Sequence, residues 1–170
     1  MIREATVQDM EEILAIYNDA IVNTTAVYDY NPHTIEDLMA WYQKKVEGNF
    51  PVLVFEEDGK LIGYATYGPF RDWAAYKYSA EHSIYVKSDE KGKGIGTILL
   101  KEIIQMAKDR EYKTLIAGID AANEVSIHLH QRLGFRHAGT IHHAGYKFNR
   151  WLDLVFYQLE LPGPREPIEK

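Results

Sequence analysis

Three groups of residues in this sequence have types and spacings that could support chemistry. The first is the glycine-rich stretch at 91–96, Lys-Gly-Lys-Gly-Ile-Gly, which follows a β-rich run and leads into a helical pattern. Backbone N–H groups in such a turn form an anion-binding concavity, and the helix that follows adds unpaired donors. The second group is Glu81 with His82, and the third is the segment from Asn123 to His130. Of the three, the glycine-rich stretch indicates a chemistry on its spacing alone, the binding of an anionic group such as phosphate.

The glycine-rich stretch does not fit the two common nucleotide motifs. A Walker loop requires G-x-x-x-x-G-K-[ST], whereas Gly96 is followed by Thr97 and Ile98. A Rossmann fingerprint requires G-x-G-x-x-G, whereas the glycines here stand at 92, 94 and 96. A phosphate-binding loop of another kind and a flexible turn that binds nothing both remain open.

Composition excludes several classes of protein. The 170 residues contain 19 Lys plus Arg and 25 Asp plus Glu, a net charge of -6, so no broad positive field is available for nucleic acid or anionic membrane. There is no cysteine, which excludes disulfides, thiolate metal sites and a cysteine nucleophile. No apolar run approaches the roughly 18 residues of a membrane span, and no signal core opens the chain, so we expect a cytoplasmic protein.

Length and the last proline cluster set the expected domain organisation. A hydrophobic content of 46% over 170 residues suits one compact domain. Prolines at 162, 164 and 167 stop the last strand, so we expect one domain over 1–161 and a Pro-rich tail over 162–170.

Periodicity predicts the order β-α-α-β-β-β-α-β-α-β-β. Capping pairs Thr6/Asp9 and Thr34/Asp37 begin the first two helices, the glycine-rich stretch begins the third, and Asn123 caps the fourth. Strands are expected at 2–5, 52–55, 61–67, 81–86, 114–119, 135–141 and 151–161.

The apolar positions predict which faces are buried. The buried face of the second helix is expected to contain Ile35, Leu38, Met39, Tyr42 and Val46. That of the third helix is expected to contain Ile95, Ile98, Leu99, Ile103, Met106 and Ala107. The last strand, 151–161, is apolar on both faces, which predicts burial on two sides. Either a dimer interface or a helix-covered inner strand would account for that pattern.

Two blocks of the sequence resemble the GNAT superfamily of acetyl-coenzyme A-dependent N-acetyltransferases. The strand at 83–86 and the stretch at 91–96 are similar to its strand–[QR]-x-x-G-x-[GA]–helix signature, with Lys91 in place of Gln or Arg. The segment 123–135 is similar to its N-x-x-[AS]-x-x-L-[YH]-x-x-x-G-F block. Pieces at 68–71, 76–86 and 150–153 resemble the phosphinothricin and methionine sulfoximine acetyltransferase branch.

The resemblance implies both a fold and an activity. The fold would be α/β (α+β), with a mixed, mostly antiparallel central sheet flanked by about four helices. The activity would be transfer of acetyl from acetyl-CoA to the amino group of a small amino-acid-like acceptor, by direct attack in a ternary complex, in a homodimer. A protein N-terminal or lysine acetyltransferase, and a non-catalytic module that senses coenzyme A or an amino acid, are the alternatives.

The resemblance also implies catalytic roles. Glu81 holds the superfamily's glutamate position, where it would act as a base or bind the substrate ammonium. The N–H of Val86 would stabilise the oxyanion, and His130, where many members have Tyr, would protonate the departing thiolate. His130 could equally be a packed helix histidine. Strand alternation directs His82 to the face opposite Glu81.

Binding residues follow from the same resemblance. The cofactor contacts would be Ile84, Tyr85, Val86, Lys91, Gly92, Lys93, Gly94, Ile95, Gly96, Thr97, Asn123, Ser126 and His130. The acceptor contacts would be Tyr28, Arg71, Tyr76, Tyr78 and Glu81, with Trp73, Lys147 and Arg150 as weaker candidates. Arg71 would bind the carboxylate or phosphinate of the acceptor. No metal is expected, because the histidine pairs 128/130 and 142/143 do not converge on one ion.

Overall fold

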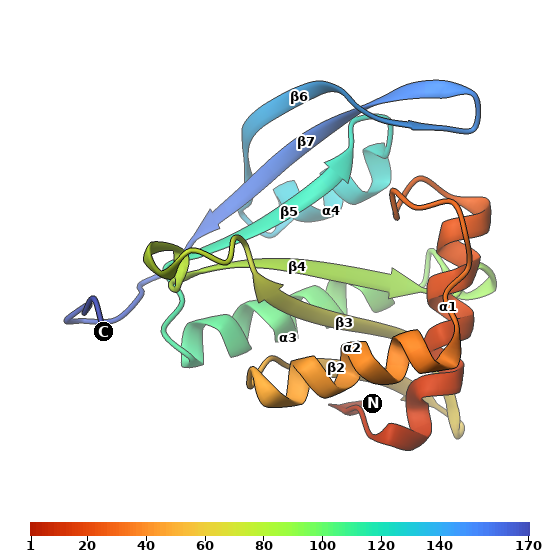
Figure 1. Cartoon of the computed structure of the whole chain (residues 1–170), viewed down its shortest axis with the longest axis horizontal. Helices are drawn as coiled ribbons and strands as arrows, with labels where there is room; N and C mark the ends of the chain where they lie inside the picture. Colours follow the sequence, from red (N-terminus) through yellow and green to blue (C-terminus); the bar gives the residue numbers. More distant parts are fainter. The chain divides into compact units, whose positions relative to one another are not determined.

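The computed structural model describes all residues, 1–170, and contains seven strands and four α-helices in the predicted order (Figure 1). The strands are β1 Ile2–Glu4, β2 Val52–Glu57, β3 Lys60–Pro69, β4 Ser79–Val86, β5 Thr114–Asp120, β6 Arg136–Lys147 and β7 Arg150–Glu160. The helices are α1 Met10–Asn23, α2 Ile35–Glu47, α3 Ile95–Asp109 and α4 Glu124–Arg132. No helix is long and apolar enough to cross a membrane.

The strands follow the order β1-β2-β3-β4-β5-β7-β6 in one sheet. The pairs β1·β2, β2·β3, β5·β7 and β6·β7 are antiparallel, and β4·β5 is parallel. The predicted mixed, mostly antiparallel α/β architecture is therefore confirmed. Contacts divide the chain into a first unit, Met1–Tyr67 with Ser83–Leu100, and a second unit, Gly68–His82 with Lys101–Lys170. Both β4 and α3 contribute residues to each unit.

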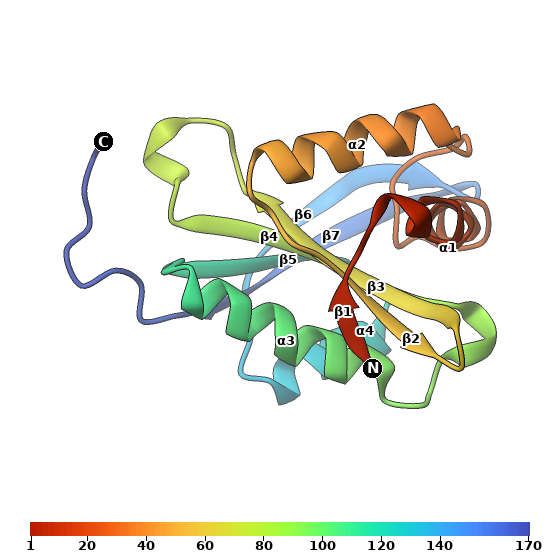
Figure 2. The same cartoon turned by 90° about the horizontal axis from the view of Figure 1, so that it is seen from below.

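The first unit has its core between α1, α2 and the β2–β3 hairpin, over which α2 lies (Figure 2). Met10, Ile13 and Ile16 of α1 and Leu38 of α2 pack against Val54 and its strand neighbours. The helices keep the predicted 3.6-residue spacing because each must bury one apolar stripe on the sheet.

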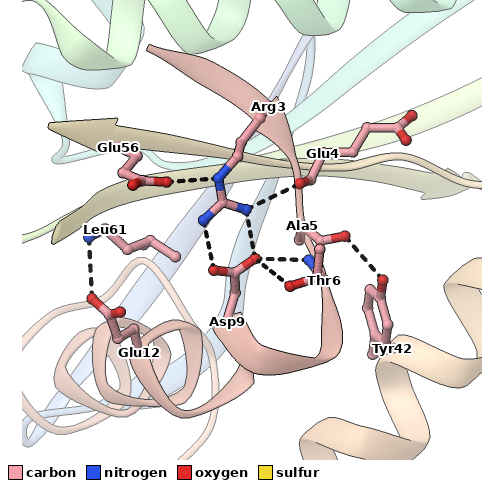
Figure 3. Close-up of polar contacts among 9 residues, drawn as sticks. All are labelled: Arg3, Glu4, Ala5, Thr6, Asp9, Glu12, Tyr42, Glu56 and Leu61. Carbon is pink, nitrogen blue, oxygen red and sulfur yellow. Dashed lines mark hydrogen bonds and ion pairs between the residues drawn. The ribbon is translucent and has the colours of Figure 1, made fainter. Parts of the chain in front are cut away.

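Polar contacts fix the start of the chain to the first unit (Figure 3). Arg3 donates to both Asp9 carboxylate oxygens at 2.8 Å and to Glu56 at 2.6 Å. Asp9 also accepts from the backbone N–H of Thr6, which completes the predicted capping pair. The hydrogen bonds from the Arg3 guanidinium, together with the weaker effect of the Thr6 N–H, hold the pKa of Asp9 below its usual value. A 3-10 turn, Val7–Asp9, precedes α1, so the helix starts later than its cap predicts.

The second unit contains the β5, β7 and β6 ribbon, in which the β6–β7 hairpin is longer than predicted (Figure 1). Gly134 ends α4 with a φ of +96°, the left-handed conformation expected there. The last strand ends at Glu160, and Leu161 donates its N–H to Lys113. The segment that follows contacts the same unit, since the backbone of Ile168 bonds with the Tyr78 hydroxyl.

Three predictions of buried faces were wrong in part. Met39 and Val46 of α2 are exposed, and Ile98 of α3 is 45% exposed, although Leu38, Leu99 and Ile103 are buried as expected. Helical periodicity gives the centre of the apolar stripe but not how far the sheet covers its edges. In β7, Leu152, Val155 and Tyr157 are buried while Trp151 is 61% exposed, so burial on both faces does not extend to its start.

Candidate functional site

The predicted anion-binding loop lies in the first unit, between β4 and α3. A short 3-10 turn, Ser88–Glu90, leads into it, and Gly92 and Gly94 adopt φ values of +83° and +81°. These left-handed values favour glycine, and nothing lies within 4 Å of the position that a Cβ would take at either residue. The loop therefore gives an anionic group open access to its backbone.

The start of α3 adds hydrogen-bond donors to this loop. The first hydrogen bond of the helix runs from the N–H of Ile98 to the carbonyl of Gly94, at 3.2 Å. The N–H groups of the three preceding residues, Ile95 to Thr97, take no part in the helical hydrogen bonds and lie at the positive end of the helix dipole. The side chain of Lys93 is paired with Glu90 at 2.6 Å, so the Glu90 carboxylate offsets the Lys93 charge. The backbone N–H groups are therefore the main donors that this loop offers to an anion.

The end of β4 before this loop is held closely against β3. A Cβ at Gly63 would stand 2.8 Å from the carbonyl oxygen of Tyr85 and 3.4 Å from Val86 Cα, so only glycine permits this approach. The Tyr85 ring packs against Tyr64 and Tyr17, with ring centroids 5.0 and 5.7 Å apart. The backbone at 84–86 is thus fixed on a rigid support.

Glu81 lies in the second unit, where β4 pairs in parallel with β5. It stands opposite Ile116, and its Oε2 would be 3.1 Å from a Cβ at Gly118. Burial raises the pKa of the Glu81 carboxyl, and the charge of Arg71 partly opposes that rise. A carboxyl with a raised pKa is suited to exchange protons close to neutrality.

The Glu81 carboxylate and an apolar surface, here called the apolar wall, both lie next to the Cβ position of Gly118. Leu154 and Phe156 of β7 lie 3.5 and 3.7 Å from the Cβ position of Gly118, which pairs directly with Phe156. Phe70 packs edge-on against Phe156 at 6.2 Å. The Glu81 carboxylate and the apolar side chains therefore lie close together above Gly118, which has no side chain to separate them.

Arg71 and Tyr76 both pack on the ring of Phe70 and so lie beside the apolar wall. The Arg71 guanidinium lies 5.3 Å from the Phe70 ring centroid, and Tyr76 packs edge-on against the same ring at 5.9 Å. Both side chains are exposed. The second unit therefore presents a carboxylate, a guanidinium and aromatic rings around Phe70 and Gly118.

The other predicted acceptor residues have the following surroundings. Tyr28 is in the first unit, and the Tyr78 hydroxyl bonds to Ile168. The Arg150 guanidinium is 3.6 Å from the buried carboxylate of Asp120, and Lys147 is buried beside Phe148. Trp73 is 78% exposed.

The Asn123 segment forms the start of α4. Asn123 Oδ1 accepts from the N–H of Ser126 at 3.2 Å, so the residue is the helix cap that the sequence predicts. The helix cap uses the side-chain oxygen and not the two donor hydrogens of the side-chain NH2. His130 is buried, and both ring nitrogens lie within hydrogen-bond distance of protein atoms, Nδ1 with the Ser126 carbonyl and Nε2 with His82.

Sequence reasoning missed Gly118, Leu154 and Phe156 as parts of the site. A glycine in the middle of β5 was the available signal, because such a glycine often marks a close approach to a strand. Their convergence on Glu81 depends on strand register, which the sequence does not give.

Comparisons with known proteins show the family of this chain. A model of the acetyltransferase (GNAT) domain matches residues 2–156. The chain is 42% identical over 165 residues to an L-methionine sulfoximine/L-methionine sulfone acetyltransferase of Pseudomonas aeruginosa, and the match covers 96% of each chain. The crystal structure of an N-acetyltransferase from Staphylococcus aureus Mu50 has a TM-score of 0.93 at 56% identity, covering 94% of this chain and 97% of that one. A phosphinothricin acetyltransferase from Sinorhizobium meliloti, in complex with acetyl-CoA, has a TM-score of 0.92 at 34% identity, covering 95% and 88%.

Proposed function

Because the chain belongs to the GNAT acetyltransferase family, we propose that it transfers acetyl from acetyl-CoA to the amino group of a small amino-acid-like acceptor, such as methionine sulfoximine or phosphinothricin. The observation that carries the proposal is the half-buried Glu81 carboxyl, with its raised pKa, facing an apolar wall near Arg71. That arrangement suits an amino-acid-like acceptor whose ammonium group must lose a proton while its acidic group is bound by the Arg71 guanidinium.

The glycine loop fits the phosphate groups of this cofactor, because its backbone is open and its two left-handed glycines precede a helix start. When bound, acetyl-CoA supplies an acetyl thioester. We assign its pyrophosphate to the N–H groups of residues 91–97 and its pantetheine arm to the backbone at 84–86 and to Asn123 and Ser126. The N–H of Val86 is the proposed oxyanion donor.

Glu81 is the proposed base. It takes a proton from the acceptor ammonium, directly or through water, so that the amine lone pair can form the new C–N bond as the C–S bond breaks. His130 is the proposed source of the proton for the departing thiolate. Arg71, Tyr76 and, from the first unit, Tyr28 are the proposed acceptor contacts, and Tyr78 supports the tail segment on the same unit.

The test is a panel of amines incubated with acetyl-CoA, read by thiol release and by the mass of the product. We expect N-acetylated methionine sulfoximine, methionine sulfone or phosphinothricin with one thiol released per product. Transfer only to peptide N-termini or lysines would favour protein acetylation instead. Binding of acetyl-CoA without turnover for any amine would favour a sensing module.

We also propose a homodimer in the cytoplasm. The β6–β7 hairpin exposes Ile141, Tyr146, Phe148 and Trp151, and Tyr146 and Trp151 pack edge-on at 5.1 Å. Exposed aromatic clusters of this kind mark interaction surfaces. Light scattering coupled to gel filtration should give twice the chain mass, and Trp151→Ser should reduce it.

One domain over 1–161 with a tail at 162–170 is the proposed organisation. The core strands end at Glu160, and no helix or strand follows. Limited proteolysis should trim the tail and leave a stable fragment that ends near Leu161.

A further inference from the structure

His82 is a buried histidine that the proposed reaction does not use. It lies on β4, is 5% exposed, and points to the face opposite Glu81. Its Nε2 is 2.9 Å from Nε2 of His130 on α4, and the two rings stack with centroids 5.1 Å apart and planes 22° apart. Phe135 packs against both rings.

The hydrogen-bond chemistry fixes where the protons are. His130 Nδ1 is 2.7 Å from the carbonyl oxygen of Ser126, and a carbonyl only accepts, so Nδ1 carries a hydrogen. In a neutral ring His130 Nε2 is then an acceptor, and the donor to it must be Nε2–H of His82. His82 Nδ1 is left as a bare lone pair, and that atom is buried with no hydrogen-bond partner.

The surroundings favour the neutral form of both rings. Burial, and for His82 the adjacent His130, lower the pKa of each imidazole. The rings face Phe135, the Ser126 carbonyl and each other, and the carboxylate of Glu81 lies on the opposite side of the strand. An unpartnered buried nitrogen is rare and costly, so a structure that keeps one requires an explanation.

We infer that His82 is a positioning residue that holds His130 in one tautomer, with the hydrogen on Nδ1 and the lone pair on Nε2. The inference rests on the proposed function only through the role of His130 as the acid.

The first test reads the tautomers without turnover, by two-bond 1H–15N spectra of protein labelled at histidine. We expect pyrrole-type nitrogens at His130 Nδ1 and His82 Nε2 and pyridine-type nitrogens at the other two positions, unchanged as the pH falls from 8 to 6. His82→Gln keeps an N–H toward His130 and should keep its tautomer, whereas His82→Leu should leave His130 as a mixture. A hydrogen on His130 Nε2 in the parent protein would overturn the inference.

The second test measures kcat against pH for His82→Leu and His82→Gln, with His128→Gln on the exposed side of α4 as the matched control. Leucine offers no donor to His130 Nε2, so we expect kcat of His82→Leu to fall about tenfold and its pH dependence to change, while His82→Gln, which keeps a donor, restores most of the parent rate. A His82→Leu profile equal to that of the control would overturn the inference. If the parent protein acetylates no amine, the proposed function fails, and the tautomer spectra still decide the pairing.

Discussion

The two units of the molecule support different kinds of chemistry. The first unit contains the glycine loop and the end of β4, where backbone groups are the proposed ligands and the side chains of Lys93 and Glu90 compensate each other. The second unit contains Glu81 and the His82–His130 pair, whose pKa values all depart from the ordinary ones because of burial. Binding a common cofactor needs only main-chain geometry, whereas proton transfer needs side chains in low-dielectric surroundings.

Glu81→Gln should give the largest effect and tests the second unit. Glutamine cannot accept a proton, so kcat should fall about 100-fold or more. In the parent protein Glu81 must be ionised to act, and its raised pKa places the acid-side loss of kcat/KM for the amine above the range of an ordinary carboxyl. Steady-state rates between pH 5 and 9 check this, and Glu160→Gln is the exposed control. An acid limb that persists in Glu81→Gln would exclude Glu81 as the titrating group.

Gly94→Ala tests the first unit. An alanine at a φ of +81° carries a strain of about 1–2 kcal/mol, which should displace the loop and raise KM for acetyl-CoA about tenfold with little change in kcat. Gly59→Ala is the matched control, since Gly59 has a φ of +75° in the β2–β3 turn and is equally open. The two variants should lose similar stability, and only Gly94→Ala should weaken cofactor binding. Equal KM values would argue against the loop as the binding site.

Gly118→Ala should give a smaller effect, confined to the acceptor. The added Cβ, 3.1 Å from Glu81 Oε2, would shift the carboxylate by a few tenths of an ångström and reduce kcat/KM for the amine about fivefold. Gly139→Ala in β6 adds a Cβ with nothing within 4 Å and serves as control. Kinetics with each substrate varied in turn check the prediction, which a raised KM for acetyl-CoA would contradict.

Arg3→Met should change stability and leave catalysis intact. Removing the donor to Asp9 and Glu56 should lower the free energy of unfolding by about 1–2 kcal/mol, whereas Arg136→Met, at an exposed pair with Glu160, should change it by less than about 0.5 kcal/mol. The folded-state pKa of Asp9 is lowered, so its contribution is present above the unfolded value of about 3.9 and is lost as the pH falls through the folded-state pKa. Urea unfolding at pH 7 and pH 3 checks both points, and equal losses for the two arginine variants would contradict them.

The same contrast explains what the sequence could predict. The helix starts at Thr34 and Asn123, the strands predicted at 52–55 and 61–67, and the loop that precedes the third helix all have local signals, and the structure confirms these elements. The positions over Gly118 could not be predicted, because they depend on the register that pairs Gly118 with Phe156, 38 residues later in the numbering. The His82–His130 contact joins residues 48 apart for the same reason.

The most direct test of the division between the two units is calorimetric titration of acetyl-CoA into Glu81→Gln and Gly94→Ala, in parallel with the parent protein. If backbone groups of the first unit bind the cofactor while Glu81 serves the acceptor, Glu81→Gln will keep the parent Kd and Gly94→Ala will bind about tenfold more weakly. A Kd that rises equally in both variants, or that is unchanged in Gly94→Ala, would contradict the account.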